Sequence, residues 1–156
     1  RLSIVTKTPK TEAKEFIERY FEKYCTIHAL QERFLEKARK EGFSETLFGR
    51  RRYLPEINAK GLLKRMAEGA AINTPIQGSA AEIIKLAMIN VEHLMREKKM
   101  QSRMILTVHD ELVFDAIKDE ELELRGMVKN AMENVVGLEV PLVVEIGKGR
   151  TWLDAH

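Results

Sequence analysis

Apolar residues in the first 42 positions recur at intervals of three and four, which is the spacing of an amphipathic helix. Gly42 favours a helix end there, because glycine readily adopts the left-handed conformation at a helix C-terminus. We therefore predict two helices, with a bend near Cys25 and Thr26. Their apolar faces are formed by Phe16, Ile17, Tyr20, Phe21 and Tyr24, and then by Ile27, Leu30, Phe34, Leu35 and Ala38.

The next segment, FSETLFGRRRYLPEI (residues 43–57), is rich in strand-forming residues and has Gly49 near its middle. This pattern predicts a β-hairpin across Gly49. Pro55 should end the second strand, because proline cannot donate a hydrogen bond to a strand ladder.

From Leu62 to about Lys98 the apolar spacing is again helical, but Pro75 interrupts it. A proline inside a helix removes a backbone donor and clashes with the preceding turn. Thr74 is suited to cap a new helix that has Pro75 at its first position. We therefore predict two helices that are separated near Asn73.

Residues 104–114, MILTVHDELVF, contain two short apolar runs on either side of His109, Asp110 and Glu111. Two such runs joined by a tight polar turn predict a β-hairpin. Adjacent carboxylates repel each other, and a cation such as Mg²⁺, which prefers oxygen ligands, relieves the repulsion. The turn is therefore a candidate metal site, with His109 as proton donor, metal ligand or phosphate contact. The alternative interpretation is a solvated acidic turn.

The remaining residues predict a helix over 120–136, with Gly137 as its stop, and then a strand. Val140, Leu142, Val144 and Ile146 alternate with other residues, as in a strand that has one face in solvent. Helices combined with antiparallel strands indicate an α+β fold.

The composition, 44% hydrophobic and 32% charged in 156 residues, is typical of a globular domain with its own core. The net charge of +2 does not by itself indicate a nucleic-acid partner. The lone Cys25 excludes an intrachain disulfide and fits a reducing compartment. No apolar run approaches membrane-spanning length, and no signal-peptide pattern opens the chain. The start at Arg1, without a methionine, is typical of a piece of a longer protein.

Asn73 and Gln77 are four residues apart, so a helix that includes both would present their amides on one face. Amide donors fit the minor groove, where every base pair shows acceptors. The alternative is that Asn73 caps a helix and Gln77 is an ordinary surface residue. The run Arg50–Arg52 suits contacts to phosphates, although such a run is also typical of a solvated face.

The order of five motifs is more specific than any one of them. TLFGRRRYLPEI, AINTPIQGSAAEIIKLAM, ILTVHDELVF, VPLVVEI and the ending WLDAH together resemble the C-terminal part of the family A DNA polymerases, the bacterial DNA polymerase I family. The segment EAKEFIERYFEKY also fits this family. The resemblance covers essentially the whole chain.

The resemblance implies an α+β fold with an antiparallel palm sheet that carries a catalytic β-hairpin and is packed by helices. Residues 1–60 would be distal fingers helices and a hairpin, and residues 61–156 the palm subdomain. By the VHDE match, Asp110 is a ligand of a catalytic Mg²⁺ pair, Glu111 its acidic neighbour, and His109 lies by the primer terminus. The residues implied to contact DNA are Asn73, Gln77, Arg50, Arg51 and Arg52.

The implied reaction is nucleotidyl transfer from deoxynucleoside triphosphates onto primer–template DNA in replication and repair, by a two-metal mechanism. The implied setting is the bacterial cytoplasm, at the nucleoid, without a membrane partner. The family's first metal-binding aspartate and its nucleotide-binding helix have no equivalent here, so we expect the isolated chain to be inactive without the rest of the polymerase chain. Departures from the family are Gly69 for arginine, Glu82 for aspartate and Cys25 for proline.

Two other functions remain open from the residues alone. One is a non-catalytic module that binds duplex DNA and needs no Asp110. The other is a small metal-dependent phosphohydrolase, which would need a further acid near the hairpin tip, with Glu145 as a candidate.

Overall fold

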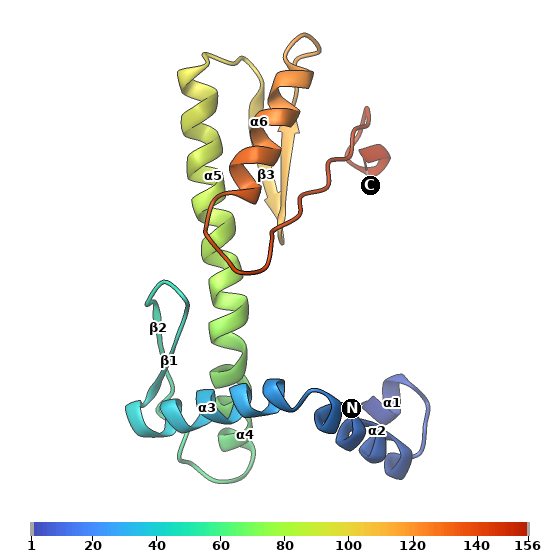
Figure 1. The fold of residues 1–156 in the computed structure, drawn as a ribbon, viewed down its shortest axis with the longest axis vertical. Helices are drawn as coiled ribbons and strands as arrows, with labels where there is room; N and C mark the ends of the chain where they lie inside the picture. Colours follow the sequence, from blue (N-terminus) through green and yellow to red (C-terminus); the bar gives the residue numbers. More distant parts are fainter. Residues whose placement is uncertain (1, 156) are drawn as a thin grey trace. The chain divides into compact units, whose positions relative to one another are not determined.

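The computed structural model describes residues 2–155, so Arg1 and the final residue of the WLDAH motif, His156, lie outside the described residues. Helices and small antiparallel sheets together confirm the predicted α+β class (Figure 1). The chain divides into two compact units, one that runs to Ile76 and one that begins at Gln77. Within residues 2–155, none of the helices combines the length and apolar character that crossing a bilayer requires.

The first unit contains most of the helices predicted from the apolar stripes. Tyr24 separates its second and third helices, which confirms the bend, and Gly42 ends the third with a left-handed φ of 77°. The Gly42 N–H donates to the Ala38 carbonyl at 2.8 Å. The elements are α1 (Leu2–Val5), α2 (Lys10–Lys23), α3 (Cys25–Glu41), β1 (Phe43–Glu45), β2 (Arg51–Tyr53) and α4 (Gly61–Asn73).

The predicted hairpin across Gly49 is confirmed. β1 and β2 pair antiparallel, with Glu45 opposite Arg51 and Ser44 opposite Arg52. The Thr46 N–H donates to the Arg50 carbonyl at 2.9 Å, and Gly49 has a φ of 83°. Only glycine adopts this conformation without a steric cost, which is why the turn lies there.

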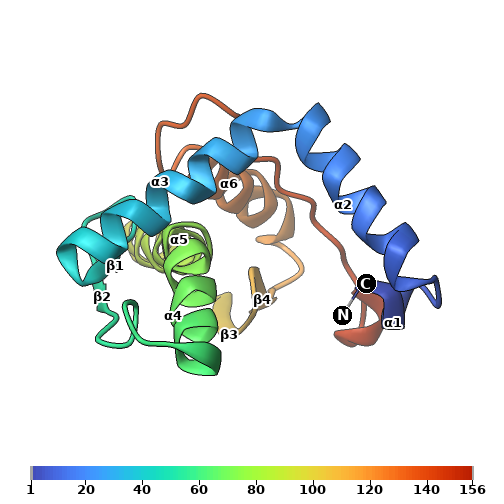
Figure 2. The same ribbon diagram turned by 90° about the horizontal axis from the view of Figure 1, so that it is seen from below.

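The core of the first unit lies where α3 crosses α4 (Figure 2). Most of its helical members are alanines, and small side chains let the two helix backbones approach closely. Arg39 on α3 pairs with Glu68 on α4 at 2.7 Å across the same contact. The buried members are Leu35, Ala38, Leu54, Ile57, Ala67 and Ala71.

The helix break predicted at Thr74 and Pro75 is wrong. The chain stays helical through this point as a π-helix, η1 (Thr74–Gly78), and Thr74 does not cap a new helix. Its hydroxyl instead donates back to the Ala70 carbonyl at 2.7 Å. Pro75 cannot donate to the Ala71 carbonyl, and the buried Ser44 hydroxyl donates to it at 2.9 Å. A side chain from β1 therefore supplies the hydrogen bond that proline removes.

The second unit packs α5 against α6 beside a hairpin. Phe114 of the hairpin lies against this core, so the hairpin is joined to the helices near its base. The elements are α5 (Ser79–Glu97), β3 (Arg103–Val108), β4 (Glu111–Asp115), α6 (Glu121–Glu133) and η2 (Leu153–Ala155). The buried core members are Val91, Met95, Leu124, Val128 and Ala131.

Two expectations for the last 40 residues are wrong. α6 ends at Glu133 rather than near Gly137, because Asn134 closes it by donating from its side chain to the Asn130 carbonyl at 2.9 Å. Residues 140–146 do not form a strand. The alternation of exposure is present, but within residues 2–155 no strand pairs with this segment.

Side chains of α6 hold the extended segment in place of a strand ladder. Lys129 donates to the Val144 carbonyl at 3.1 Å, and the Val144 N–H donates to Glu133 at 3.0 Å. The alternation of exposed and half-buried side chains in this segment therefore occurs without a partner strand.

Candidate functional site

The acidic hairpin has the geometry that the sequence predicted. β3 and β4 pair antiparallel, and the pair Val108–Glu111 closes a two-residue turn made of His109 and Asp110. His109 has a φ of 54°. A two-residue hairpin turn needs such a left-handed residue to match the twist of its strands. For a residue with a Cβ this conformation costs about 1 kcal/mol, which the flanking ladder must offset.

The two carboxylates at this tip face solvent. Asp110 lies in the turn and Glu111 is the first residue of β4, and both are exposed. Among residues 2–155, no hydrogen bond or ion pair involves the Asp110 carboxylate. A hard cation such as Mg²⁺ favours exposed carboxylate oxygens of this kind and keeps much of its own water. The donor chemistry of Asp110 and Glu111 therefore fits part of a Mg²⁺ site.

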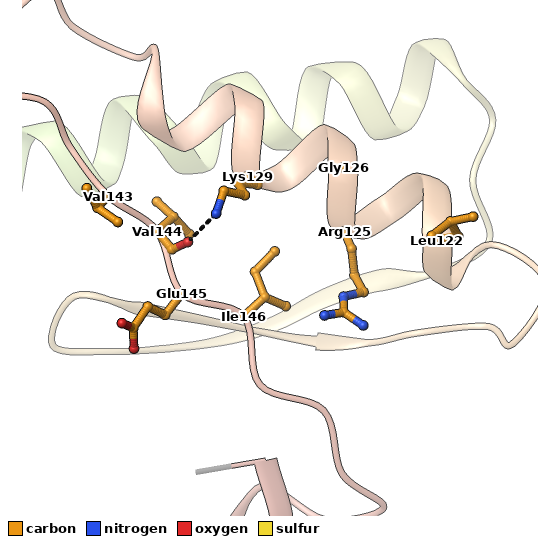
Figure 3. A pocket seen from close by; sticks show the side chains of 8 residues that line it. All are labelled: Leu122, Arg125, Gly126, Lys129, Val143, Val144, Glu145 and Ile146. Atoms are coloured by element: carbon orange, nitrogen blue, oxygen red, sulfur yellow. Dashed lines mark hydrogen bonds between the residues drawn. The ribbon is translucent and has the colours of Figure 1, made fainter.

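The structure does not bring a third ligand to the tip. In the described part of the chain, no three side chains of His, Cys, Asp or Glu lie together as a metal-binding group. Glu145 lines a separate open hollow of about 780 Å³ between α6 and residues 143–146, and its side chain points away from Lys129 (Figure 3). The phosphohydrolase interpretation required a further acid near the tip, and Glu145 does not join the hairpin acids in such a group.

Two residues that sequence reasoning missed hold the base of the hairpin. The Glu120 carboxylate accepts hydrogen bonds from the N–H groups of Gln101 at 2.9 Å and Ser102 at 2.8 Å, and from the Ser102 hydroxyl at 2.7 Å. The Ser102 oxygen also accepts from the Ile117 N–H at 2.9 Å.

These donors lower the pKa of the Glu120 carboxyl below its usual range, and the Gln101 N–H contributes most. In the sequence, this arrangement has only a weak signal. Glu120 lies in an acidic run just before a helix, and such runs are usually solvated.

The two candidate amide residues are both exposed. Asn73 is the last residue of α4, and Gln77 lies within η1. Residues four apart share one face of an α-helix, whereas residues 74–78 are π-helical. Between and just before these two residues, Ala71 and Thr74 are buried and face the interior of the first unit.

The three arginines of the first hairpin differ in their surroundings, although all are exposed. Arg51 donates to Glu45 at 3.1 Å, and its guanidinium lies 4.5 Å from the centre of the Phe43 ring. Donation by Arg51 lowers the pKa of Glu45. Arg52 lies opposite Ser44, hence on the other face of the hairpin. Arg51 therefore links the two strands of the hairpin through Glu45 and Phe43.

Gly69 lies exposed on α4, one helical turn before Asn73. A Cβ atom built at Gly69 meets no atom within 4 Å. The position is therefore open to a side chain at its Cβ, and it faces solvent.

Comparison with known proteins identifies the relatives of this chain. The profile described as DNA polymerase family A matches residues 1–154. The thermostable DNA polymerase I of Thermus thermophilus is 46% identical over 156 residues, which is 99% of this chain and 18% of that protein. DNA polymerase I of Lactococcus lactis subsp. cremoris is 43% identical over 147 residues, which is 94% of this chain and 17% of that protein.

Among solved structures, the POL domain of Pol1 from M. smegmatis, in complex with DNA primer–template and dNTP, matches with a TM-score of 0.94. It is 42% identical, and the match covers 99% of this chain and 27% of that one. The chain thus spans less than a fifth of the length of the curated relatives described above. The family predicted from the motif order is confirmed, and the chain belongs to DNA polymerase family A.

Proposed function

We propose that this chain is the C-terminal fingers and palm part of a template-directed DNA polymerase, with residues 1–60 in the fingers and 61–156 in the palm. One observation carries the proposal: the β3–β4 turn presents the exposed Asp110 carboxylate, without a partner among residues 2–155, in a chain whose family match runs from residue 1 to 154. The M. smegmatis relative was solved with primer–template and dNTP, which supports the same partners here.

In the proposed reaction, the 3′-hydroxyl of a primer attacks the α-phosphate of a deoxynucleoside triphosphate, and pyrophosphate leaves. Asp110, with Glu111 beside it, would hold part of a two-ion Mg²⁺ site. When bound, the ions lower the pKa of the hydroxyl and stabilise the leaving oxygen. A metal site needs ligands held closely to one geometry, and the strand pair positions the turn that carries Asp110 and the first β4 residue, Glu111. His109 would lie by the primer terminus.

The duplex would be held without regard to base sequence. Asn73 and Gln77 are proposed to donate to minor-groove acceptors, which every base pair shows. Arg50, Arg51 and Arg52 are proposed to contact DNA from the fingers side, with Arg52 the strongest candidate because Arg51 is bound to Glu45. A polymerase of this kind would act in replication and repair in the bacterial cytoplasm, at the nucleoid.

Primer extension tests the proposal. The full-length protein that carries this segment should extend a primer on a template with Mg²⁺ and all four nucleotides, and the isolated 156-residue chain should not. The isolated chain has no equivalent of the family's first metal-binding aspartate or of its nucleotide-binding helix. A full-length protein that binds duplex but never extends it would instead support the non-catalytic module.

Gly69→Arg is expected to tighten binding to primer–template by about fivefold to tenfold at about 0.1 M salt, and to steepen the salt dependence by about one counterion. The added guanidinium would lie one helical turn from Asn73. Fluorescence anisotropy with a labelled duplex, at several salt concentrations, measures both effects.

Gly69→Ala is the matched control, because it also removes the glycine but adds no charge. It should raise helix stability by about 0.5–1 kcal/mol and leave DNA affinity unchanged. Equal affinity of the arginine and alanine variants would show that this face of α4 does not meet the duplex.

A further inference from the structure

We propose that Glu120 and Ser102 are positioning residues that set where the β3–β4 hairpin presents Asp110. The inference rests on the proposed function, since it concerns the same hairpin tip. Neither side chain lies at the tip. Both act at the opposite end of the hairpin, where the two strands join the rest of the second unit.

The hydrogen bonds connect both chain ends of the hairpin to one point. Gln101 and Ser102 lead directly into β3, and Ile117 follows the end of β4. The Ser102 oxygen contacts Ile117 on one side and Glu120 on the other, and Glu120 immediately precedes α6. We call these hydrogen bonds of Glu120 and Ser102 the clamp. Because α6 packs on α5 through the core of this unit, the clamp joins the hairpin to the packed helices.

Among residues 2–155, the other anchor of the hairpin on the helices is Phe114, which packs against the core near the same end. The sheet of the hairpin has two strands, and a two-stranded hairpin is only marginally stable by itself. Ile105 and Leu106 of β3 are 60% and 49% exposed, so this part of the strand is not packed into the described core. The bonds to Glu120 are charge-assisted and roughly twice as strong as neutral ones.

A small tilt at the base becomes a large displacement at the tip. The six residues of β3 extend about 20 Å, so a tilt of about 3° moves the tip by about 1 Å. A misplacement of about 1 Å at a reacting group can lower a rate about 100-fold. The clamp therefore acts on the position of Asp110, although it lies a whole strand away from it.

Both oxygens of the Glu120 carboxylate act as acceptors: Oε2 accepts from all three donors, and Oε1 accepts from the Gln101 N–H as well. Glutamine has nearly the same shape, but its NH₂ group would place a donor against the Gln101 N–H or against the Ser102 donors, and the charge that strengthens these bonds would be lost. Glu120→Gln should therefore weaken the clamp. Glu123→Gln is the matched control, because Glu123 lies one helical turn on in α6, is exposed, and contacts only the Lys98 ammonium across a 2.5 Å ion pair in the described residues.

The test measures primer extension by the full-length protein, with Mg²⁺ titrated and with rates normalised to the concentration of active primer–template complex. Glu120→Gln should lower the maximal rate by about 10- to 100-fold and raise the Mg²⁺ midpoint, while the Kd for primer–template stays unchanged. Ser102→Ala should act in the same direction, and Glu123→Gln should match the wild type.

Three outcomes would count against the positioning role of Glu120 and Ser102 or against the proposed function. A Glu120→Gln rate within about twofold of the wild type would overturn the inference while leaving the proposed function intact. A loss of rate that merely follows the loss of folded protein and of DNA affinity, with the Mg²⁺ midpoint unmoved, would show a structural role only and would also overturn it. A wild-type protein that does not extend primers would refute the proposed function itself, independently of either variant.

Discussion

Replacing Asp110 by alanine is expected to lower primer extension by the full-length protein at least about 10³-fold, while its affinity for duplex DNA is kept. Removing a metal ligand removes transition-state stabilisation of several kcal/mol, and about 4 kcal/mol corresponds to about 10³ in rate. The carboxylate is exposed and has no partner among residues 2–155. Its loss therefore leaves no buried group unsatisfied, and stability should change by no more than about 0.5 kcal/mol.

Single-turnover extension and duplex binding should be measured on the same preparation. Asp119→Ala is the control, because Asp119 is also exposed and lies in the same unit, away from the hairpin tip. That variant should extend primers like the wild type. Full activity of Asp110→Ala would remove the catalytic role of the hairpin and leave duplex binding as the function of this chain.

Ser44→Ala is expected to lower the free energy of unfolding of the chain by about 1–3 kcal/mol, the usual result of leaving a buried acceptor unsatisfied. Ser44 is 4% exposed and Ala71 is fully buried, so water does not readily replace the lost hydroxyl. Urea unfolding followed by circular dichroism measures the change. Ser44 and Ala71 both belong to the first unit, so the loss of unfolding free energy should come from that unit.

A double-mutant cycle with Pro75→Ala separates this cause from simple loss of packing. Alanine at position 75 restores an N–H that is able to donate to the Ala71 carbonyl in an α-helix. Ser44→Ala should then be less harmful, with a coupling of about 1 kcal/mol between the two substitutions. Strictly additive effects would mean that Ser44 does not compensate for the proline.

Local chemistry made several elements predictable from the sequence. Gly42 and Gly49 have positive φ values where a helix end and a hairpin turn require them. The apolar spacing over residues 120–136 predicted a helix, and α6 covers Glu121–Glu133. The VHDE run gave the hairpin and its acidic tip, because a short apolar–polar–apolar pattern contains all the information that a two-residue turn needs.

Other features depended on residues far apart in the sequence. Pro75 is expected to break a helix when only its neighbours are considered, but a serine 31 positions earlier supplies the missing donor to Ala71. Residues 140–146 alternate like a strand, yet a strand also needs a partner, and side chains of α6 hold this segment instead. Glu120 belongs to an acidic run of a kind that is usually solvated, but its carboxylate accepts hydrogen bonds from three donors at residues 101 and 102.

The sequence by itself determined the family, the chemical character of the hairpin tip and most of the helices. Motifs, turns and apolar periodicity each depend on residues that are close together in the chain. The tertiary structure decided which polar side chains hold the backbone. It showed that Ser44 supports the proline-containing helix and that Glu120 and Ser102 hold the hairpin base. Those roles depend on hydrogen-bond distances near 3 Å between residues that only folding brings together.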